Sequence, residues 1–329
     1  MNRRLLFSIV VVAGYALTTC PLLADKLCPG NTIKMVVQFG AGASIDVATR
    51  AVAASMEKRI GQQVVVVNMP GAGGQIAAQY VHDAMPDFCT VGSFSSAPFS
   101  MLPAQEKSKG KVPPYDSLSG FSPIGRTFET TFVLAVNKQF PARSMREFIA
   151  YAKLHPLKVN VGASYQLADV TLELLQSHFG IKVSPIPYRK GDVTSLPDLE
   201  TDRIQAAVMT LGAALPRIEN EQLYPLFVIA QRRHRSLPEV PTVDELGITE
   251  LDGVRTWLGM MGPAGLPAGK VERFNQALAA TLAEPEIVAA LQKLGMKPDP
   301  SSPGELYAQI KRQIPAWEDL AERNIVKFQ

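Results

Sequence analysis

Two glycine-rich turns are the segments of this chain best suited to bind a ligand. The first spans residues 39–46 (FGAGASID) and the second spans residues 68–74 (NMPGAGG). Each follows an apolar run and precedes a helical pattern, so its backbone N–H groups and the positive end of the next helix point outward. In an open α/β sheet, ligands bind at this carboxyl edge. Together the two turns predict a site for one small acid.

Neither turn contains Lys or Arg, so we expect backbone N–H groups rather than an arginine to anchor the acid. Two other interpretations remain open. Each segment can be a tight turn without a ligand, and Gly71, Ala72 and Gly73 form part of a dinucleotide-binding fingerprint whose third glycine is missing. Neither turn carries the Lys and Ser or Thr that complete a phosphate-binding loop.

Asp46, at the end of the first turn, also has two interpretations. A carboxylate in the first turn of a helix is favoured by the helix dipole, with Ser44 as the N-cap. Alternatively, Asp46 accepts hydrogen bonds from backbone N–H groups of the neighbouring loop and holds its shape. A carboxylate aimed directly at an anionic ligand would repel it, so direct contact is not expected.

The remaining residue types give no catalytic or metal site. The histidines (His82, His155, His178 and His234) are scattered, and none has metal-ligand spacing from a Cys or another His. No Ser/His/Asp set has a nucleophile-elbow context, and the cysteines have no nearby His. We therefore predict no catalytic residue, no metal and no cofactor.

The elements that must position the turns follow from the hydrophobic pattern. Residues 33–39 and 62–69 are predicted to be buried parallel strands. Between them, apolar residues recur at every fourth position of a helix that Gly61 ends. This is a βαβ unit, and similar alternation continues along the chain. Further strands are predicted at residues 88–94, 131–137, 158–162, 181–187, 204–209 and 223–229, which makes the chain an α/β protein.

The last third of the sequence is more helical, with helices predicted at residues 267–283, 285–295 and 303–323. Chains longer than about 250 to 300 residues usually divide their core, and this one has 329, so we expect two domains. Two proline-rich stretches, residues 111–123 and 237–242, are where domain crossings are predicted.

The composition is that of a globular protein, and the N-terminal segment indicates export. Apolar residues make up 47% and charged residues 19%, the net charge is +3, and no run of about 18 apolar residues suggests a membrane span. No basic stripe with interleaved aromatic residues indicates nucleic-acid binding. The first 24 residues have a basic start, a short apolar stretch and a cleavage site after Ala24, which predicts a signal peptide.

The export route stays open. Arg3 and Arg4 resemble a twin-arginine signal, although the apolar stretch suits the general secretory route better. Cys20 lies in a weak lipoprotein box, so a lipid anchor on Cys20 is the alternative to cleavage after Ala24. If Cys20 is removed, Cys28 and Cys89 remain in an oxidising compartment. With a strand order of 2-1-3 they would share the amino-terminal edge of the sheet, so we predict a disulfide between them.

The two turns also carry a family resemblance. The first resembles the F-x-P-G-G-x-x-D turn, and the second matches the N-x-P-G-A-G-G turn, of the substrate-binding proteins of tripartite tricarboxylate transporters, also called Bug receptors. Further matching stretches span nearly the whole mature chain: residues 187–191 (PYRKG), 235–247 (RSLPEVPTVDELG), 257–259 (WLG) and 262–267 (GPAGLP).

This resemblance implies a periplasmic binding protein with a type II-like fold. Two lobes, each a doubly wound and mainly parallel sheet, would close on a small carboxylate and deliver it to a membrane permease or a sensor. We expect lobe 1 to comprise residues 25–123 and 236–329, including the helical C-terminal segment, and lobe 2 to comprise residues 124–235. The chain should cross near residues 121–126 and return near residues 231–237. A monomer is expected, and an exported α/β enzyme acting on a small organic acid is the alternative.

The resemblance does not identify which carboxylate this chain binds, because the sequence departs from the family pattern in two loops. Ala41 and Ala43 replace the usual Pro and Gly, and the loop at residues 162–169 (GASYQLAD) is shorter than usual. Arg126, Arg189 and Arg255 are interpreted as structural or solvated, with contact to a second acidic group as the alternative. The expected ligand-binding residues are Phe39, Gly40, Ala41, Gly42, Ala43, Ser44, Asp46, Pro70, Gly71, Ala72, Gly73, Ser95, Ser96, Phe128, Ser164, Tyr165 and Asp192.

Overall fold

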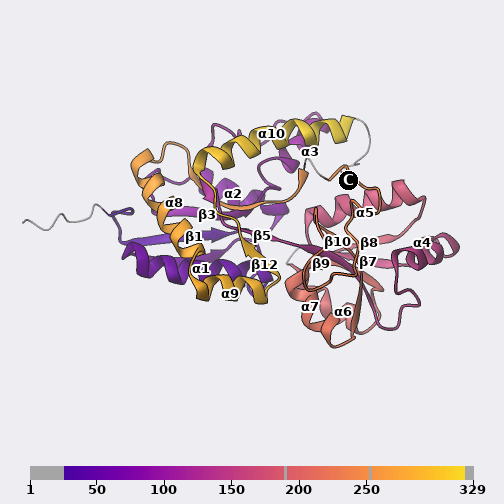
Figure 1. Cartoon of the computed structure of the whole chain (residues 1–329). Coiled ribbons are helices and arrows are strands. Elements are labelled where there is room, and N and C mark those ends of the chain that lie inside the picture. Colours follow the sequence, from indigo (N-terminus) through magenta and orange to yellow (C-terminus); the bar gives the residue numbers. More distant parts are fainter. Residues whose placement is uncertain (1–25, 189–190, 252–253, 323–329) are drawn as a thin grey trace, which may run out of the picture.

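The computed structural model describes residues 26–188, 191–251 and 254–322, which form two α/β lobes side by side (Figure 1). The predicted signal peptide, with Cys20, and Arg189 lie outside the described residues. None of the described helices combines the length and apolarity needed to cross a bilayer.

The first lobe is built on a five-stranded sheet with the order β2-β1-β3-β11-β4. The three N-terminal strands are parallel, as the βαβ pattern predicts, and β11 runs antiparallel to both of its neighbours. The order 2-1-3, on which the disulfide prediction depended, is the order observed. The strands are β1 (Thr32–Val37), β2 (Gln63–Asn68), β3 (Thr90–Ser95), β4 (Phe121–Arg126) and β11 (Leu258–Pro263).

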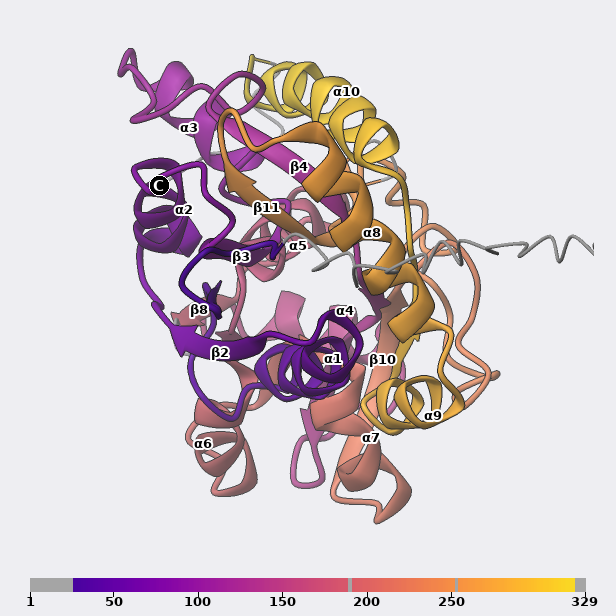
Figure 2. The ribbon, with the colours of Figure 1, turned by 90° about the vertical axis from the view of Figure 1, so that its left-hand side faces the viewer.

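Helices cover both faces of this sheet (Figure 2). One face packs against α1 (Ser44–Ile60) and α8 (Ala268–Leu282), with α9 (Pro285–Lys293) against these two helices. The other side carries α2 (Gln75–His82) and α10 (Pro303–Glu322), with α3 (Met101–Ser108) against α10. The alternation of strand side chains explains why both faces need cover: in β1, Met35 belongs to one apolar cluster and Val36 to another.

The second lobe repeats this plan with the strand order β10-β6-β9-β7-β8, in which only β6 runs against its neighbours. Within β6, Leu134 and Val133 point to opposite faces and enter different apolar clusters. The elements are β6 (Phe132–Asn137), α4 (Met145–Leu154), β7 (Asn160–Ala163), α5 (Gln166–Phe179), β8 (Ser184–Pro187), α6 (Leu196–Glu200), β9 (Ala206–Thr210), α7 (Leu211–Glu219) and β10 (Leu223–Ile229).

Two segments connect the lobes. The first passes from β4 to β6 through the short strand β5 (Phe128–Thr130), which pairs with β12 (Met296–Pro298). The return segment first runs beside β10, where the Val228 N–H donates to Pro241 O at 2.9 Å, and then reaches β11. Strand pairing therefore puts the first crossing after β4 rather than within it, and the proline-rich stretch 237–242 in contact with the second lobe. Which residues move together as one lobe stays a prediction.

Helix α1 follows the predicted pattern at its end but not at its start. Met56 is buried, and Gly61 ends the helix with a φ of 65°, donating its N–H to Glu57 O. The prediction that Ser44 is the N-cap is wrong. Ala43 is the N-cap and provides no side-chain cap, whereas the Ser44 hydroxyl contacts side chains of the second lobe.

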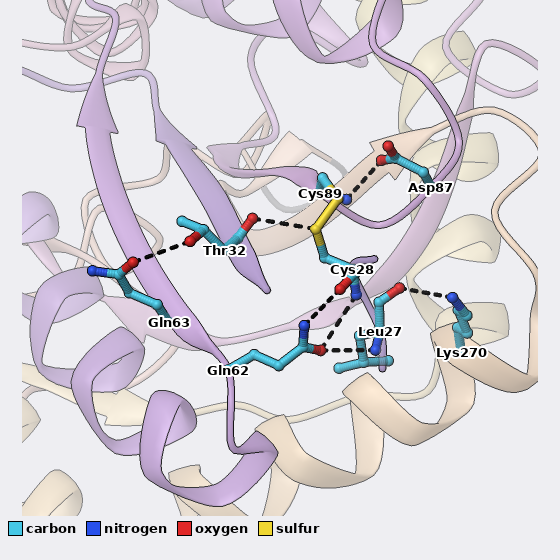
Figure 3. The surroundings of a disulfide bond; sticks show 8 residues. All are labelled: Leu27, Cys28, Thr32, Gln62, Gln63, Asp87, Cys89 and Lys270. Carbon is cyan, nitrogen blue, oxygen red and sulfur yellow. Dashed lines mark hydrogen bonds between the residues drawn. A yellow bond between two sulfur atoms is a disulfide. The ribbon is translucent and has the colours of Figure 1, made fainter. Parts of the chain in front are cut away.

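The predicted disulfide is confirmed (Figure 3). The Cα atoms of Cys28 and Cys89 are 4.7 Å apart, at the amino-terminal ends of neighbouring strands. Gln62 fixes the segment before β1, because its side chain accepts from Leu27 N at 2.7 Å and donates to Cys28 O at 2.7 Å. The bridge therefore lies at the opposite edge of the sheet from the two glycine turns.

Replacing both cysteines, Cys28→Ser with Cys89→Ser, should lower the free energy of unfolding by about 2 to 5 kcal/mol, because the bridge closes 61 residues of the unfolded chain. Chemical denaturation measures the change. Ligand affinity should remain unchanged, since the bridge is remote from the turns. A double variant as stable as the wild type, or with impaired binding, would contradict this role.

Candidate functional site

A cleft between the lobes brings together the carboxyl ends of strands from both sheets. It contains two small spaces of about 20 Å³ each, which share Phe39, Tyr165 and Gln166 as walls. The other walls of one space are Ile45, Ser95, Ala97, Phe132, Leu167 and Thr256. Those of the other are Gln38, Gly71, Gly73, Gly74, Ser164 and Gly191. The glycine turns of lobe 1 thus face the loops that follow β7 and β8 of lobe 2.

The first turn is shaped by Asp46, which is 1% exposed. Its Oδ2 accepts from the Gly42 N–H at 2.9 Å, and its Oδ1 accepts from Asn68 Nδ2 at 2.7 Å. Asn68 begins the second turn, so this carboxylate connects the two turns. Arg50, one helical turn further on, donates to the carboxylate at 3.1 Å and balances its charge. Asp46 therefore braces the turns and does not line the cleft.

The start of α1 supplies donors toward the cleft. Its first internal hydrogen bond runs from the Val47 N–H to Ala43 O at 3.0 Å. The N–H groups of Ser44, Ile45 and Asp46 consequently have no acceptor inside the helix, and the Ala43 N-cap has no side chain to satisfy them. Because Ile45 lines the cleft, this end of the helix can stabilise a negative charge there.

The second turn needs glycine for its backbone path. Gly71, Gly73 and Gly74 have φ angles of 135°, 65° and 101°, a region that side chains disfavour. Gln38 holds this turn to β3, donating to Ser95 Oγ at 3.0 Å and accepting from the Ser95 N–H at 2.9 Å. A Cβ atom at Gly74 would lie 2.8 Å from the Gln38 side chain, so the turn is packed tightly against Gln38.

Tyr165 is the central residue of lobe 2 in the cleft. It is 6% exposed, and its ring packs edge-on against Phe39 and Phe132, with centroids 5.9 and 5.3 Å away. Its buried hydroxyl lies close to Asp192, but the contact does not have the geometry of a hydrogen bond, and no other described residue accepts from it. Burial, and then the negative charge of Asp192, raise the pKa of Tyr165 well above its usual value. The hydroxyl therefore stays protonated and can donate to a ligand oxygen.

Asp192 lies behind this tyrosine and joins the lobes. It is fully buried, and its carboxylate accepts from the hydroxyls of Thr210 and, at 3.4 Å, Ser44, and from the Val193 N–H at 3.0 Å. Ser44 belongs to lobe 1, so the carboxylate bonds across the cleft. A second contact between the lobes occurs at the glycine turn, where a Cβ at Gly73 would lie 2.6 Å from Gln166 Nε2.

The structure brings together many of the predicted residues, although their role in binding stays a prediction. Phe39, Gly71, Gly73, Ser95, Ser164 and Tyr165 line the two spaces. Asp192, Ser44 and Ala43 lie directly behind these walls, while Gly40, Ala41, Gly42, Pro70 and Ala72 belong to the turns themselves.

Two predicted residues lie elsewhere. Phe128 is buried in β5, opposite Pro298 of β12, and Phe132 occupies the cleft instead. Ser96 takes part in hydrogen bonds through its backbone: its N–H donates to Trp257 O, and its carbonyl oxygen accepts from the Ser100 hydroxyl. The cleft-lining residues Gln38, Gln166 and Thr256 were not predicted from the sequence. A polar Gln38 at the end of a buried strand was a usable signal, but the other two reach the cleft only through the packing of the lobes.

The arginines considered for a second acidic group are already paired. Arg126 Nε is 2.8 Å from Asp299 Oδ2, and Arg255 is 2.7 Å from Asp244 Oδ1. Both line a separate cavity of about 340 Å³ beside the crossing segments. The described residues contain no group of His, Cys, Asp and Glu side chains placed to hold a metal ion.

Comparison with known proteins identifies the family of this chain. Residues 48–324 match the model of the tripartite tricarboxylate transporter family receptor. The chain belongs to this receptor family. A UPF0065 protein of Bordetella pertussis is 31% identical over 291 residues, which is 87% of each chain.

Solved structures show the same fold. The receptor superposes on the periplasmic binding protein BugD with a TM-score of 0.81 and 27% identity, over 91% of this chain and 99% of that one. An R. palustris protein with adipate gives a TM-score of 0.78 and 26% identity, over 88% and 96% of the two chains. The predicted family and two-lobed α/β fold are therefore confirmed.

Tyr165→Phe should separate stability from binding. It removes a buried hydroxyl that lacks a hydrogen bond, so the ligand-free protein should lose no stability and can gain up to about 1 kcal/mol. Ligand affinity should fall about tenfold, because a donor to the carboxylate is lost. Thermal unfolding and calorimetry measure the two effects.

Tyr115→Phe is the matched control. Tyr115 is equally buried, at 6% exposure, but donates to Pro98 O at 2.9 Å and lies outside the cleft. Its loss should cost about 1 kcal/mol of stability and leave binding unchanged. The same pattern in both variants would contradict a ligand-directed role for Tyr165.

Proposed function

We propose that this receptor captures a small carboxylate in the periplasm and delivers it to the membrane subunits of a tripartite transporter or to a sensor. The observation that carries the proposal is the cleft: two glycine turns and the start of α1 face a buried, unbonded tyrosine hydroxyl of the other lobe. The family and the neighbour with adipate support a carboxylate ligand. The predicted signal peptide and the disulfide support export to an oxidising compartment.

The anchoring groups in this proposal are backbone donors. N–H groups of the two turns and of the first turn of α1 would share the carboxylate oxygens with the Tyr165 hydroxyl. Hydrogen bonds to a charged group contribute about 1.5 to 3 kcal/mol each, so three or four of them can supply most of the roughly 8 kcal/mol that micromolar binding requires. The ligand needs no arginine for its first carboxylate.

Closure of the lobes would complete the site. The segments that connect the lobes, residues 127–131 and 244–251, would act as the hinge, so the lobes would divide after the boundaries predicted from the sequence at residues 123/124 and 235/236. The Ser44 to Asp192 hydrogen bond and the approach of Gln166 to Gly73 both join opposite lobes, so they would form on closing. A ligand between the lobes would then favour the closed state.

Gly73→Val should abolish binding while the fold stays intact. The added side chain would meet Gln166 and Leu102, at 2.6 and 2.8 Å for the Cβ alone, where the lobes approach each other. Affinity for whichever of hexanoate, adipate, benzoate and terephthalate binds the wild type should fall about 100-fold or more by calorimetry. Gly269→Val, on α8 with open space around its Cβ, is the control and should bind normally. Full affinity in the Gly73 variant would overturn the proposed site.

Ligand should also compact the molecule. If the crossing segments form a hinge, saturating ligand will lower the radius of gyration measured by small-angle X-ray scattering, because the closed state is favoured. The Gly73→Val protein should show no such change when the same acid is added. Identical scattering of the wild type with and without a ligand that calorimetry shows to bind would contradict closure.

A further inference from the structure

One short segment of lobe 2, residues 210–212, touches lobe 1 at two places. It joins the end of β9 to the start of α7. At one place the Thr210 hydroxyl lies 3.2 Å from the Ser44 hydroxyl, at the start of α1. At the other, Gly212 lies against the backbone of Leu294, which follows the last residue of α9. We call these two contacts the seam between the lobes.

The contact at Gly212 is one of backbone against backbone. A Cβ atom at Gly212 would overlap the carbonyl oxygen of Leu294 and would lie 2.6 Å from its carbonyl carbon. Gly295 faces the same contact with a φ of 63°, and a Cβ atom there would lie 3.0 Å from the Gly212 nitrogen. Backbone atoms cannot rotate away as the end of a flexible side chain can. The lobes therefore fit together here because neither glycine has a side chain.

The other lobe, and not the helix, accounts for glycine at position 212. Gly212 is the second residue of α7, and Gly269 and Gly304 are the second residues of α8 and α10. A Cβ atom at either of the latter two would meet nothing within 4 Å in the described part of the chain. Alanine favours helices more than glycine does, so alanine suits all three helix starts. Of the three, only Gly212 has a backbone of the other lobe in the way.

The charges along the seam favour the same contact. The buried carboxylate of Asp192 accepts from the hydroxyls of Thr210 and, at 3.4 Å, Ser44, which stand at the starts of α7 and α1. The start of a helix carries a partial positive charge and its end a partial negative charge. The carboxylate therefore lies beside two positive helix ends from opposite lobes. In addition, the negative end of α9 at Leu294 meets the positive end of α7.

The seam is distinct from the walls of the ligand cleft. Thr210, Gly212 and Leu294 line neither of the two cleft spaces. The seam instead begins at the connection between the lobes, where the Leu211 N–H donates to Thr131 O at 2.8 Å. Because it lies next to this connection, a small separation at the seam would hold the lobes further apart at the cleft.

We propose that Gly212 is a positioning residue of the receptor, which lets the lobes close and so raises the affinity for every ligand without touching any. This inference rests on the lobe closure of the proposed function and concerns the balance between open and closed states, not the ligand class. If only the closed receptor holds the ligand, the apparent affinity falls in proportion to the closed population. A change at the seam must then weaken all ligands by the same factor.

Gly212→Ala tests this role by calorimetry. Whichever of hexanoate, adipate, benzoate and terephthalate bind the wild type should bind the variant about tenfold or more weakly, all by the same factor. Gly304→Ala makes the same change at the same helix position in open space and should bind normally. Wild-type affinity in the Gly212 variant, or factors that differ from one acid to another, would refute the inference.

A cysteine pair measures closure of the seam directly. Ser44→Cys with Thr210→Cys puts two thiols where the hydroxyls lie 3.2 Å apart, so diamide can join them only while the seam is closed. In the ligand-free protein the bridge should form about tenfold more slowly when Gly212→Ala is added, and at the original rate when Gly304→Ala is added. Mass spectrometry without reduction follows the reaction. Equal rates with and without the Gly212 change would show that the seam does not control closure.

These results separate the inference from the proposed function. Cross-linking needs no ligand, so it decides the role of Gly212 even if none of the four acids binds. Loss of binding in Gly73→Val together with full affinity in Gly212→Ala would remove the inference and leave the proposed function standing. The contact joins two lobes that each have their own core, so far-UV circular dichroism of Gly212→Ala should match the wild type. A variant that does not fold would show that the contact serves folding instead of closure.

Discussion

The buried carboxylate of Asp46 is the interaction on which the ligand site depends. It accepts from the Gly42 N–H of the first turn and from Asn68 of the second, and Asn68 in turn donates to Phe39 O at 2.9 Å. The two turns come from different strands, so without this link their N–H groups would not be fixed relative to each other. Asp46 lies in the first turn of α1, where the helix dipole favours a negative charge, as predicted. Its donor from the second turn is the Asn68 side chain, whereas a backbone N–H of the neighbouring loop was expected.

The lobes are connected by contacts that also shape the site. Asp192 bonds to Ser44 at the start of α1, and Gln166 lies against the second glycine turn. The groups that hold the closed cleft are therefore neighbours of those that would hold the ligand. Closure of the lobes and recognition of the ligand are therefore coupled. The ligand would reach the donors of the turns and of lobe 2 together only in the closed state, in which the Asp192 carboxylate lies beside the start of α1.

The periodicity of apolar residues predicted those elements of the fold that form from residues close together in the sequence. The unit β1-α1-β2 was predictable because apolar residues repeat with a helical period and Gly61 ends the helix. The strands β4 (FSPIGR) and β11 (LGMMGP) could not be predicted from the sequence, because both contain Pro and Gly, which are uncommon within strands. They form because they pair with each other although more than 130 residues separate them in the sequence. The disulfide was predictable only together with the strand order.

The candidate site also has parts that the sequence predicts and parts that only the structure shows. Glycine turns and the short loop with Tyr165 are visible in the sequence because their residue types are unusual there. Which aromatic residue faces the cleft, Phe128 or Phe132, depends on how β5 pairs with β12. The bond between Ser44 and Asp192 joins residues 148 positions apart and exists only because the lobes meet. Contacts between lobes leave no periodic signal, so they required the structure.

A crystal structure of the receptor with its tightest-binding acid tests the central claim most directly. The account predicts the carboxylate between the two glycine turns, with its oxygens about 2.7 to 3.1 Å from backbone N–H groups of the turns or the start of α1 and from the Tyr165 hydroxyl. A carboxylate bound instead to Arg126 or Arg255 in the neighbouring cavity, with the turns unoccupied, would contradict it.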